Sequence, residues 1–323
     1  MKEVQQATED IIRQASKVII GKETQIRFVV MAIFCGGHVL FEDLPGVGKT
    51  TLVKVLSRAL GCSFSRVQFT PDLLPSDILG MSVFNQKIGD FEIRLGPVMS
   101  NLFLADEINR AIPRTQAALL EAMEERQVTI DNQTYPLPDP FLVMATQNPI
   151  DMESTFRLPL AQMDRFLIRI SLGYPAHGEE TRMLRVVGDE IPFAEVKAIV
   201  DARGIAEIQQ EIRSIHVSDT VLDYIVSLVE ATRKDKRFRL PVGPRGSRAL
   251  YRAGKVWAAM AGRDFVTPDD IKSLAPTVLC HRLHLSQEAL LEGLKAEKLL
   301  EDILVNTPAP LSKEEILRAG NKS

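Results

Sequence analysis

The segment HVLFEDLPGVGKTTL, residues 38–52, reads as a short apolar strand, a glycine-rich bend and the start of a helix. Gly46 and Gly48 permit backbone angles that turn successive N–H groups inward. Lys49 adds a positive charge, and a helix that begins there directs its partial positive end at the same place. Such a bend predicts a cradle for the phosphates of a nucleotide.

The bend matches the P-loop pattern at every fixed position except the first. Asp43 stands where the pattern has its first glycine, and the Thr50 hydroxyl stands where it has a magnesium ligand. A plain glycine turn is the alternative, and the GKTT ending after an apolar strand argues against it. We therefore expect the loop residues to contact a nucleotide: Gly46, Val47, Gly48, Lys49, Thr50 and Thr51.

Length and charge limit the class of protein. A chain of 323 residues exceeds one ordinary core, so two domains are expected, and an apolar content of 45% can fill both. Lys plus Arg number 39 and Asp plus Glu number 42, which gives a net charge of −3. This balance does not indicate an electrostatic grip on nucleic acid.

Three cysteines, Cys35, Cys62 and Cys280, lie far apart and form no C-x-x-C spacing, which favours reduced thiols. Residues 1–10 are polar and acidic, unlike a secretory signal. The longest strongly apolar stretch, residues 28–35, is too short to cross a bilayer. We therefore expect a cytoplasmic protein without a transmembrane segment.

Helical periodicity and short apolar runs alternate through the first half of the chain. Continuous apolar strands are typical of a parallel sheet covered on both faces, so this half predicts an α/β fold. Strands are expected at residues 39–41, 64–69, 101–107, 141–145 and 164–170, and helices at 4–19, 24–34, 49–60 and 115–126.

Two hairpins and a change of composition complete the outline. The segment 70–98 is punctuated by prolines and predicts an insertion, with a hairpin at Met81–Arg94, and a second hairpin is expected about residues 131–133. Tyr174 and Pro175 mark the expected boundary between domain 1–174 and domain 175–323. The second domain is expected to be all-α, with helices at 179–187, 206–215, 218–233, 248–261, 268–279 and 287–304.

The strand at 101–107 ends in two carboxylates, Asp106 and Glu107. Beside a phosphate loop, Asp106 can hold hydrated Mg²⁺, and Glu107 can orient and deprotonate a water aimed at the γ-phosphate. Capping of the helix near Pro113 is the alternative role for this pair. Asn148 follows the next strand, where its amide could reach the γ-phosphate or the water, although Asn before Pro is also ordinary turn chemistry.

Three longer runs are more specific: VQFTPDLLPSD at 67–77, LADEINRA at 104–111 and LLEAMEERQV at 119–128. With the loop and the acidic pair, they make the chain resemble the MoxR family of AAA+ ATPases. The resemblance is dense between residues 18 and 175 and continues over 246–283. It implies a P-loop AAA+ core with a five-stranded parallel sheet between helices, followed by an all-α lid domain.

The resemblance also implies residue roles. Lys49 and Thr50 match Walker A, Asp106 and Glu107 match Walker B, and Asn148 matches sensor 1. Thr50 and Asp106 would then be the Mg²⁺ ligands for bound ATP.

Further roles follow from the same resemblance. Ile20 and Gly21 would lie beside the adenine. Arg165 matches the finger that reaches a neighbouring subunit's γ-phosphate, and a salt bridge within one subunit is its alternative role. Arg248 matches sensor 2 in the lid, with Arg245 as the competing assignment. The rivals of Arg165 are Arg110, Arg114 and Arg157.

At the level of assembly, the resemblance implies a hexameric ring of identical subunits whose two hairpins face a central pore. It implies chaperone-like maturation of client proteins, often with a von Willebrand factor A domain partner, and in some cases insertion of a metal or cofactor into the client.

Two other functions stay open. A nucleic-acid motor of the same superfamily would share the ATP residues but should add a basic pore or winged helix; the basic run 234–239 is the only faint cue, and such a run is more often a solvated loop. A nucleotide-binding scaffold with little turnover is the second, and the set Lys49, Glu107 and Arg165 argues against it. His281 and His284 could share a helical face, but no Cys or acidic cluster completes a metal site there.

Overall fold

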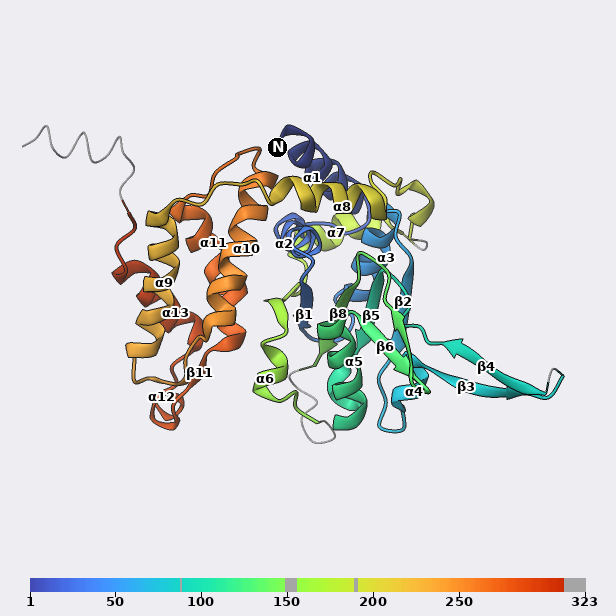
Figure 1. Ribbon diagram of the computed structural model, residues 1–323. Coiled ribbons are helices and arrows are strands. Elements are labelled where there is room, and N and C mark those ends of the chain that lie inside the picture. The colour runs from blue at the N-terminus through green and yellow to red at the C-terminus, as the bar shows by residue number, and fades with distance from the viewer. Residues whose placement is uncertain (88, 149–155, 189–190, 311–323) are drawn as a thin grey trace, which may run out of the picture. The chain divides into compact units, whose positions relative to one another are not determined.

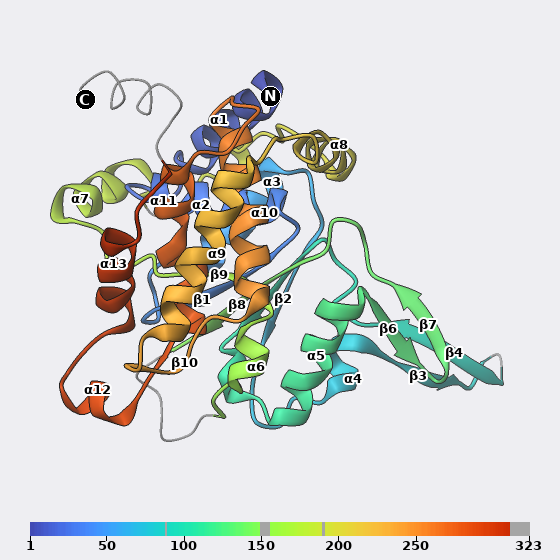
Figure 2. The same cartoon turned by 60° about the vertical axis from the view of Figure 1, so that its left-hand side comes forward.

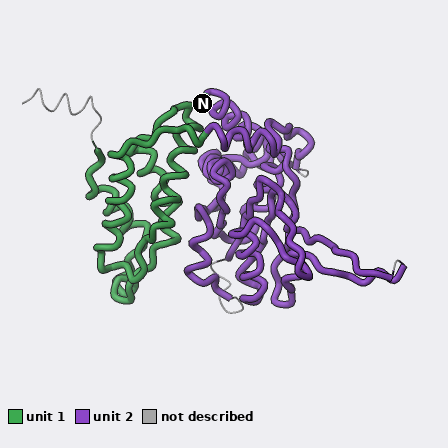
Figure 3. Tube along the Cα trace, in the orientation of Figure 1, with its two compact units in different colours: residues 1, 212–323 green, residues 2–211 purple. Residues whose placement is uncertain are grey.

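The computed structural model describes residues 1–87, 89–148, 156–188 and 191–310. The chain forms two compact units, Lys2–Glu211 and Ile212–Ser323 (Figure 3). Each unit has its own helices and its own buried apolar residues.

The first unit is built on a five-stranded parallel sheet with strand order β2-β5-β8-β1-β9 (Figure 1). This confirms the predicted α/β core with its five parallel strands. The strands are β1 (His38–Glu42), β2 (Phe64–Gln68), β5 (Leu102–Asp106), β8 (Leu142–Gln147) and β9 (Phe166–Ile170). Because all five run in one direction, the ends of β1, β5 and β8 lie along one edge of the sheet, where the phosphate loop begins.

Helices cover the sheet. The helices of this unit are α1 (Lys2–Ala15), α2 (Glu23–Phe34), α3 (Lys49–Ala59), α4 (Pro75–Leu79), α5 (Pro113–Glu125), α6 (Leu160–Met163), α7 (His177–Val186) and α8 (Ala202–Ile212). Alternate strand residues, among them Leu40, Phe103 and Val143, share one apolar cluster with Leu119 and Leu120 of α5. The intervening residues of β1, β5 and β8 are equally buried, so both faces are covered, as continuous apolar strands require.

Both predicted hairpins are present. Strands β3 (Gly80–Asn85) and β4 (Asp90–Leu95) pair antiparallel, as do β6 (Gln127–Ile130) and β7 (Gln133–Pro136). Figures 1 and 2 show β3–β4 extending away from the sheet with β6–β7 beside its base, and β3 contacts β6. Ile88, which lies between Asn85 and Asp90 in the sequence, is outside the described residues.

The division between the units differs from the boundary expected at residues 174/175, because it falls between Glu211 and Ile212. The intervening segment contacts the end of α3. Ile199 N–H donates to the Ala59 carbonyl at 2.8 Å, and Arg58 Nη1 donates to the Phe193 carbonyl at 2.7 Å. The change in amino-acid composition at Tyr174 therefore does not coincide with the boundary between the two compact units.

The second unit is helical, as predicted, apart from one short ribbon. Its helices are α9 (Asp219–Lys234), α10 (Pro244–Met260), α11 (Pro268–Leu279), α12 (Gln287–Leu291) and α13 (Ala296–Asn306). Strands β10 (Phe238–Leu240) and β11 (His284–Leu285) pair antiparallel, which the all-α prediction missed. The helix expected at 287–304 is broken at Gly293, which adopts a left-handed φ of 73°. None of the described helices combines the length and apolar character needed to cross a bilayer.

Candidate active site

The phosphate loop joins β1 to α3. Gly46 and Gly48 both have left-handed backbone angles, with φ of 82° and 90°. Gly48 is the N-cap of α3, so the helix begins at Lys49 and places Thr50 and Thr51 in its first turn. A residue with a Cβ is strained at these φ values, so the two glycines permit the bend that the sequence predicts.

Lys49 is held inside the loop that it closes. Its side chain is buried, and its Nζ donates to the carbonyl oxygens of Asp43 at 3.0 Å and Leu44 at 3.1 Å. Burial lowers the pKa of Lys49, and the carboxylates of Asp43, Asp106 and Glu107 oppose that lowering. The ammonium is thus directed by backbone carbonyls toward the loop interior.

Asp43, the departure from the P-loop pattern, has a structural explanation. Its buried carboxylate accepts hydrogen bonds from Ser171 Oγ at 2.6 Å, from Leu172 N–H at 2.5 Å and from Gly173 N–H at 3.1 Å. These three donors follow β9. Asp43 therefore ties the start of the phosphate loop to the end of the neighbouring strand, which a glycine cannot do.

Thr146 orders the acidic pair at the end of β5. Its Oγ1 donates to Asp106 Oδ1 at 2.6 Å and accepts from the Glu107 N–H at 2.8 Å. Glu107 has a left-handed φ of 54°, so the chain turns sharply directly after the strand. Sequence reasoning missed Thr146. The available signal was its position near the end of β8, two residues before Asn148.

Strand β2 supplies two further contacts that sequence reasoning missed. Arg66 donates to Asp106 Oδ2 from Nε at 3.1 Å and from Nη2 at 2.7 Å. Gln68 Nε2 donates to Glu107 Oε2 at 2.8 Å, and Arg110 Nη1 donates to the same oxygen at 2.9 Å. Arg66 and Gln68 are two residues apart on one strand, so their side chains share a face of the sheet.

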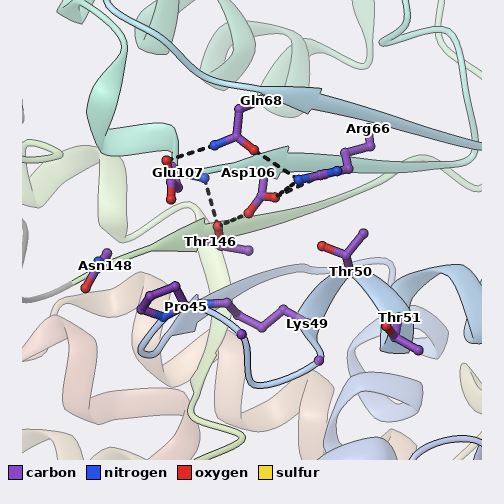
Figure 4. A pocket seen from close by; sticks show the side chains of 12 residues that line it. Pro45, Lys49, Thr50, Thr51, Arg66, Gln68, Asp106, Glu107, Thr146 and Asn148 are labelled. Carbon is purple, nitrogen blue, oxygen red and sulfur yellow. Dashed lines mark hydrogen bonds and ion pairs between the residues drawn. The ribbon is translucent and has the colours of Figure 1, made fainter. Parts of the chain in front are cut away.

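One pocket of about 370 Å³ brings the loop and the acids together. In Figure 4, Asp106 and Glu107 lie across this pocket from Lys49 and Thr50. Its walls are formed by Pro45, Gly46, Gly48, Lys49, Thr50, Thr51, Arg66, Gln68, Asp106, Glu107, Thr146 and Asn148. Of the loop residues expected to contact a nucleotide, only Val47 is not part of these walls.

The donor set fits a magnesium nucleotide. A left-handed glycine bend and a buried lysine suit phosphate oxygens, while a hydroxyl and a carboxylate supply the hard oxygen ligands that Mg²⁺ prefers. Thr50 and Asp106 line the same pocket from α3 and β5, so both can face one ion.

Ile20 and Gly21 line a different pocket, of about 460 Å³, with residues of α7 and the turn before it. Gly21 has a left-handed φ of 73°, and a Cβ built there would lie 2.1 Å from the side chain of Glu179. The left-handed φ favours glycine at this position, and any larger residue would also have to displace the end of the Glu179 side chain. The proximity of these residues to an adenine stays a prediction.

The predicted arginines lie in different places. Arg165 does not line the phosphate pocket; its Nη2 pairs with Glu124 Oε2 of α5 at 2.7 Å. The salt bridge considered as its alternative role thus exists. Arg248 is exposed near the start of α10 in the second unit, as is Arg245, and sensor 2 stays a prediction for either.

The weaker candidates gain no support from the described residues. Among the described residues, no group of three or more His, Cys, Asp or Glu side chains could hold a metal ion. In the basic run 234–239, Arg237 pairs with Asp235 at 2.7 Å and Phe238 is buried, so the only aromatic residue there belongs to the core. Cys35 and Cys280 are buried, Cys62 is partly buried, and none of the three forms a disulfide among the described residues.

Comparisons with known proteins cover both units. Residues 38–168 match the model of the "ATPase family associated with various cellular activities (AAA)", and residues 230–303 match the "AAA lid domain". YeaC of Bacillus subtilis is 44% identical over 94% of this chain and 95% of its own length. The protein named Chaperone MoxR1 of Mycobacterium tuberculosis is 39% identical over 94% of this chain and 82% of its own.

Two further proteins are similar to this chain over nearly its whole length. A protein named MoxR from Methylorubrum extorquens is 34% identical, over 92% of this chain and 94% of its own length. A crystal structure from Cytophaga hutchinsonii superposes with a TM-score of 0.89 at 38% identity, covering 96% of this chain and 98% of that one.

Proposed function

The chain belongs to the MoxR family of AAA+ ATPases, and from this membership we propose that it hydrolyses Mg-ATP in a ring of identical subunits and remodels client proteins. The observation that carries the proposal is the pocket in which the loop at Lys49 faces the acids Asp106 and Glu107. A glycine turn or a helix cap alone would not place these groups on facing walls.

Each wall of the pocket has a distinct role in the proposed reaction. Lys49 and the N–H groups of the loop would bind the β- and γ-phosphates. Thr50 and Asp106 would hold Mg²⁺, which when bound offsets the negative charge of the transferred phosphoryl group. Glu107 would accept a proton from the attacking water, and Asn148 would orient that water or the γ-phosphate.

The contacts around Glu107 suit a general base whose carboxylate must be oriented toward the attacking water. Gln68 and Arg110 both donate to its Oε2, and its own N–H is held by Thr146. The two side-chain donors restrict the rotamers of the carboxylate and the backbone hydrogen bond to Thr146 fixes its starting point, so the carboxylate is positioned before a nucleotide enters. Prepositioning of this kind lowers the entropic cost of reaching the reactive geometry.

Arg165 is proposed as a finger that acts on the neighbouring subunit. Its absence from the walls of its own pocket agrees with that role, and its ion pair with Glu124 would hold it while no neighbour's phosphate is in reach. The two partly exposed side chains form a pair that contributes little net stability, so exchange of partners costs little. Such a finger can raise the rate about a thousandfold or more.

The β3–β4 hairpin is proposed as the client-contacting element. Phe84 and Phe91 are directly paired across the strands, 52% and 65% exposed, with ring centroids 5.3 Å apart. Ile93 and Leu95 continue the same face of the ribbon. Contiguous exposed apolar side chains mark interaction surfaces. We propose a hexameric cytoplasmic ring, with a von Willebrand factor A domain protein as partner and, in some family members, metal or cofactor insertion as the outcome.

Mixed rings test the proposed mechanism. Glu107→Gln should retain ATP binding and lose nearly all hydrolysis, and Arg165→Ala should also lose hydrolysis. Because the two defects lie on opposite sides of one subunit boundary, mixing the variants should restore part of the ATPase activity. Absence of any recovery in rings shown to contain both variants would refute the action of Arg165 on a neighbour.

The alternative functions give different results in the same assay. ATPase activity per subunit that rises with protein concentration supports the ring, whereas a scaffold would bind ATP with negligible turnover at every concentration. Stimulation by DNA with a steep salt dependence would instead favour a nucleic-acid motor. A pull-down with the Glu107→Gln variant from the parent cell would identify the client.

A further inference from the structure

Arg66 forms an ion pair with Asp106, the carboxylate that the proposed function assigns to Mg²⁺. Two nitrogens of its guanidinium donate to Asp106 Oδ2, at 3.1 and 2.7 Å. The other oxygen, Oδ1, accepts from Thr146 at 2.6 Å. Both oxygens of Asp106 are thus engaged, and its negative charge is compensated within the protein.

Arg66 is placed for this contact by its strand and by a neighbour. It lies on β2, which is at the edge of the sheet, and β2 pairs with β5 in register from Phe64 to Gln68. Its Nη2 also donates to Gln68 Oε1 at 3.0 Å, which is a second anchor independent of Asp106. The Asp106 side chain is only 13% exposed, whereas that of Arg66 is 46% exposed. The arginine can therefore move toward solvent while the carboxylate stays in place.

A carboxylate oxygen that already binds one cation binds a second cation more weakly. A positively charged group that donates to Oδ2 lowers the affinity of that oxygen for Mg²⁺, both by repulsion and by occupying its lone pairs. The ion must then displace the guanidinium, or bind with the arginine still nearby at a cost. Arg66 also lines the phosphate pocket, so it acts at the place where the ion would bind.

We propose that Arg66 is a built-in counter-ion for Asp106 that competes with Mg²⁺, and that it sets the magnesium concentration at which the nucleotide complex forms. The inference rests on the proposed function, because it takes Asp106 as the metal-holding acid. Arg66 is a positioning residue in this scheme: it neutralises Asp106 in the metal-free protein and withdraws, tethered by Gln68, when the ion binds.

The test measures equilibrium binding of the fluorescent analogue mant-ADP, first in EDTA and then at increasing Mg²⁺ concentration. The variant is Arg66→Met, which keeps an unbranched apolar stem and removes the guanidinium group with its charge. The matched control is Arg110→Met, which removes the same charge from an arginine that contacts Glu107 and not Asp106. The control therefore reports the general electrostatic effect of losing one positive charge near the pocket.

Arg66→Met should lower the Mg²⁺ concentration at half-maximal tightening by roughly three- to tenfold relative to Arg110→Met, because two guanidinium nitrogens donate to one oxygen of Asp106 but the arginine is partly exposed. Arg66→Lys, which keeps the charge but lacks the planar fork, should give a smaller shift in the same direction. This variant also keeps the test valid if Arg66→Met folds poorly.

The outcomes separate the inference from the function on which it rests. Equal Mg²⁺ midpoints for Arg66→Met and Arg110→Met would overturn the counter-ion role. Weaker mant-ADP binding in both EDTA and Mg²⁺ would overturn it too, since that result identifies Arg66 as a phosphate ligand. If the wild-type protein binds mant-ADP under neither condition, the proposed function itself fails, and this inference fails with it.

Discussion

Replacing Asp43 with glycine restores the P-loop pattern, yet the contacts of this residue predict that the change destabilises the protein. The buried carboxylate accepts from Ser171 Oγ and from the N–H groups of Leu172 and Gly173. Glycine leaves all three donors without this acceptor and frees the backbone of the unfolded chain. Motif matching alone predicts a neutral or favourable change, so the two views make opposite predictions.

The magnitude follows from the three donors. Hydrogen bonds to a charged acceptor contribute about 1.5–3 kcal/mol each, and water entering the space recovers part of the sum, so we expect a loss of about 3 kcal/mol. For a unit of this size that loss lowers the midpoint of thermal unfolding by about 6–12 °C. Asp43→Asn, which keeps one oxygen acceptor, should fall between the wild type and Asp43→Gly.

The assay is thermal unfolding followed by circular dichroism, with hydrogen exchange read at the amides of Leu172 and Gly173. Both amides should exchange faster in Asp43→Gly than in the wild type, while amides of α10 (Pro244–Met260), in the other unit, serve as the internal control. An unchanged midpoint together with unchanged exchange at these two amides would refute the reasoning. A change in the midpoint alone would show that the loss arises elsewhere in the unit.

Three further predictions are independent of Asp43. Phe84→Ser with Phe91→Ser should leave the unfolding midpoint within about 1 °C, because both rings are exposed, and should abolish stimulation of the ATPase by client; retained stimulation would contradict the role of the hairpin. Burial and the nearby Asp201 carboxylate raise the pKa of Cys62 to about 11, so its thiol stays protonated at pH 8. Iodoacetamide should therefore alkylate Cys62 about a hundredfold more slowly than a free cysteine at pH 8, and the rate of alkylation should increase toward pH 11. Thr146→Val removes the hydroxyl that orders both acids and should reduce kcat about ten- to hundredfold with unchanged mant-ADP affinity in EDTA; an equal loss of affinity would indicate general damage to the pocket.

Much of the fold could be predicted from local pattern. The continuous apolar runs became the inner strands β1, β5 and β8 of a parallel sheet, because a strand covered on both faces needs apolar side chains at consecutive positions. The edge strand β2, with the sequence FSRVQ, carries exposed polar side chains instead. The glycine bend and the acidic pair each follow an apolar run, and parallel strands end at a common edge. That rule alone predicts that they meet, and they line one pocket.

Other features depended on contacts that no local pattern contains. The ribbon of β10 and β11 joins Phe238 to Leu285, and its first strand was hidden in a charged run. The segment between Tyr174 and Glu211 packs on α3 although its composition differs from that of the core. Packing partners far apart in sequence decide such cases, and periodicity reports only the neighbours of a residue along the chain.

The sequence by itself determined the phosphate loop, the acids and the family of the protein, because these depend on residue types at short, fixed spacings. Only the tertiary structure decided which side chains form hydrogen bonds with Asp106 and Glu107. Arg66 meets Asp106, and Thr146 bridges that acid to its neighbour, through the register of β2, β5 and β8. Strand register brings together side chains some forty residues apart, and it is set by the packing of the whole sheet rather than by any one segment.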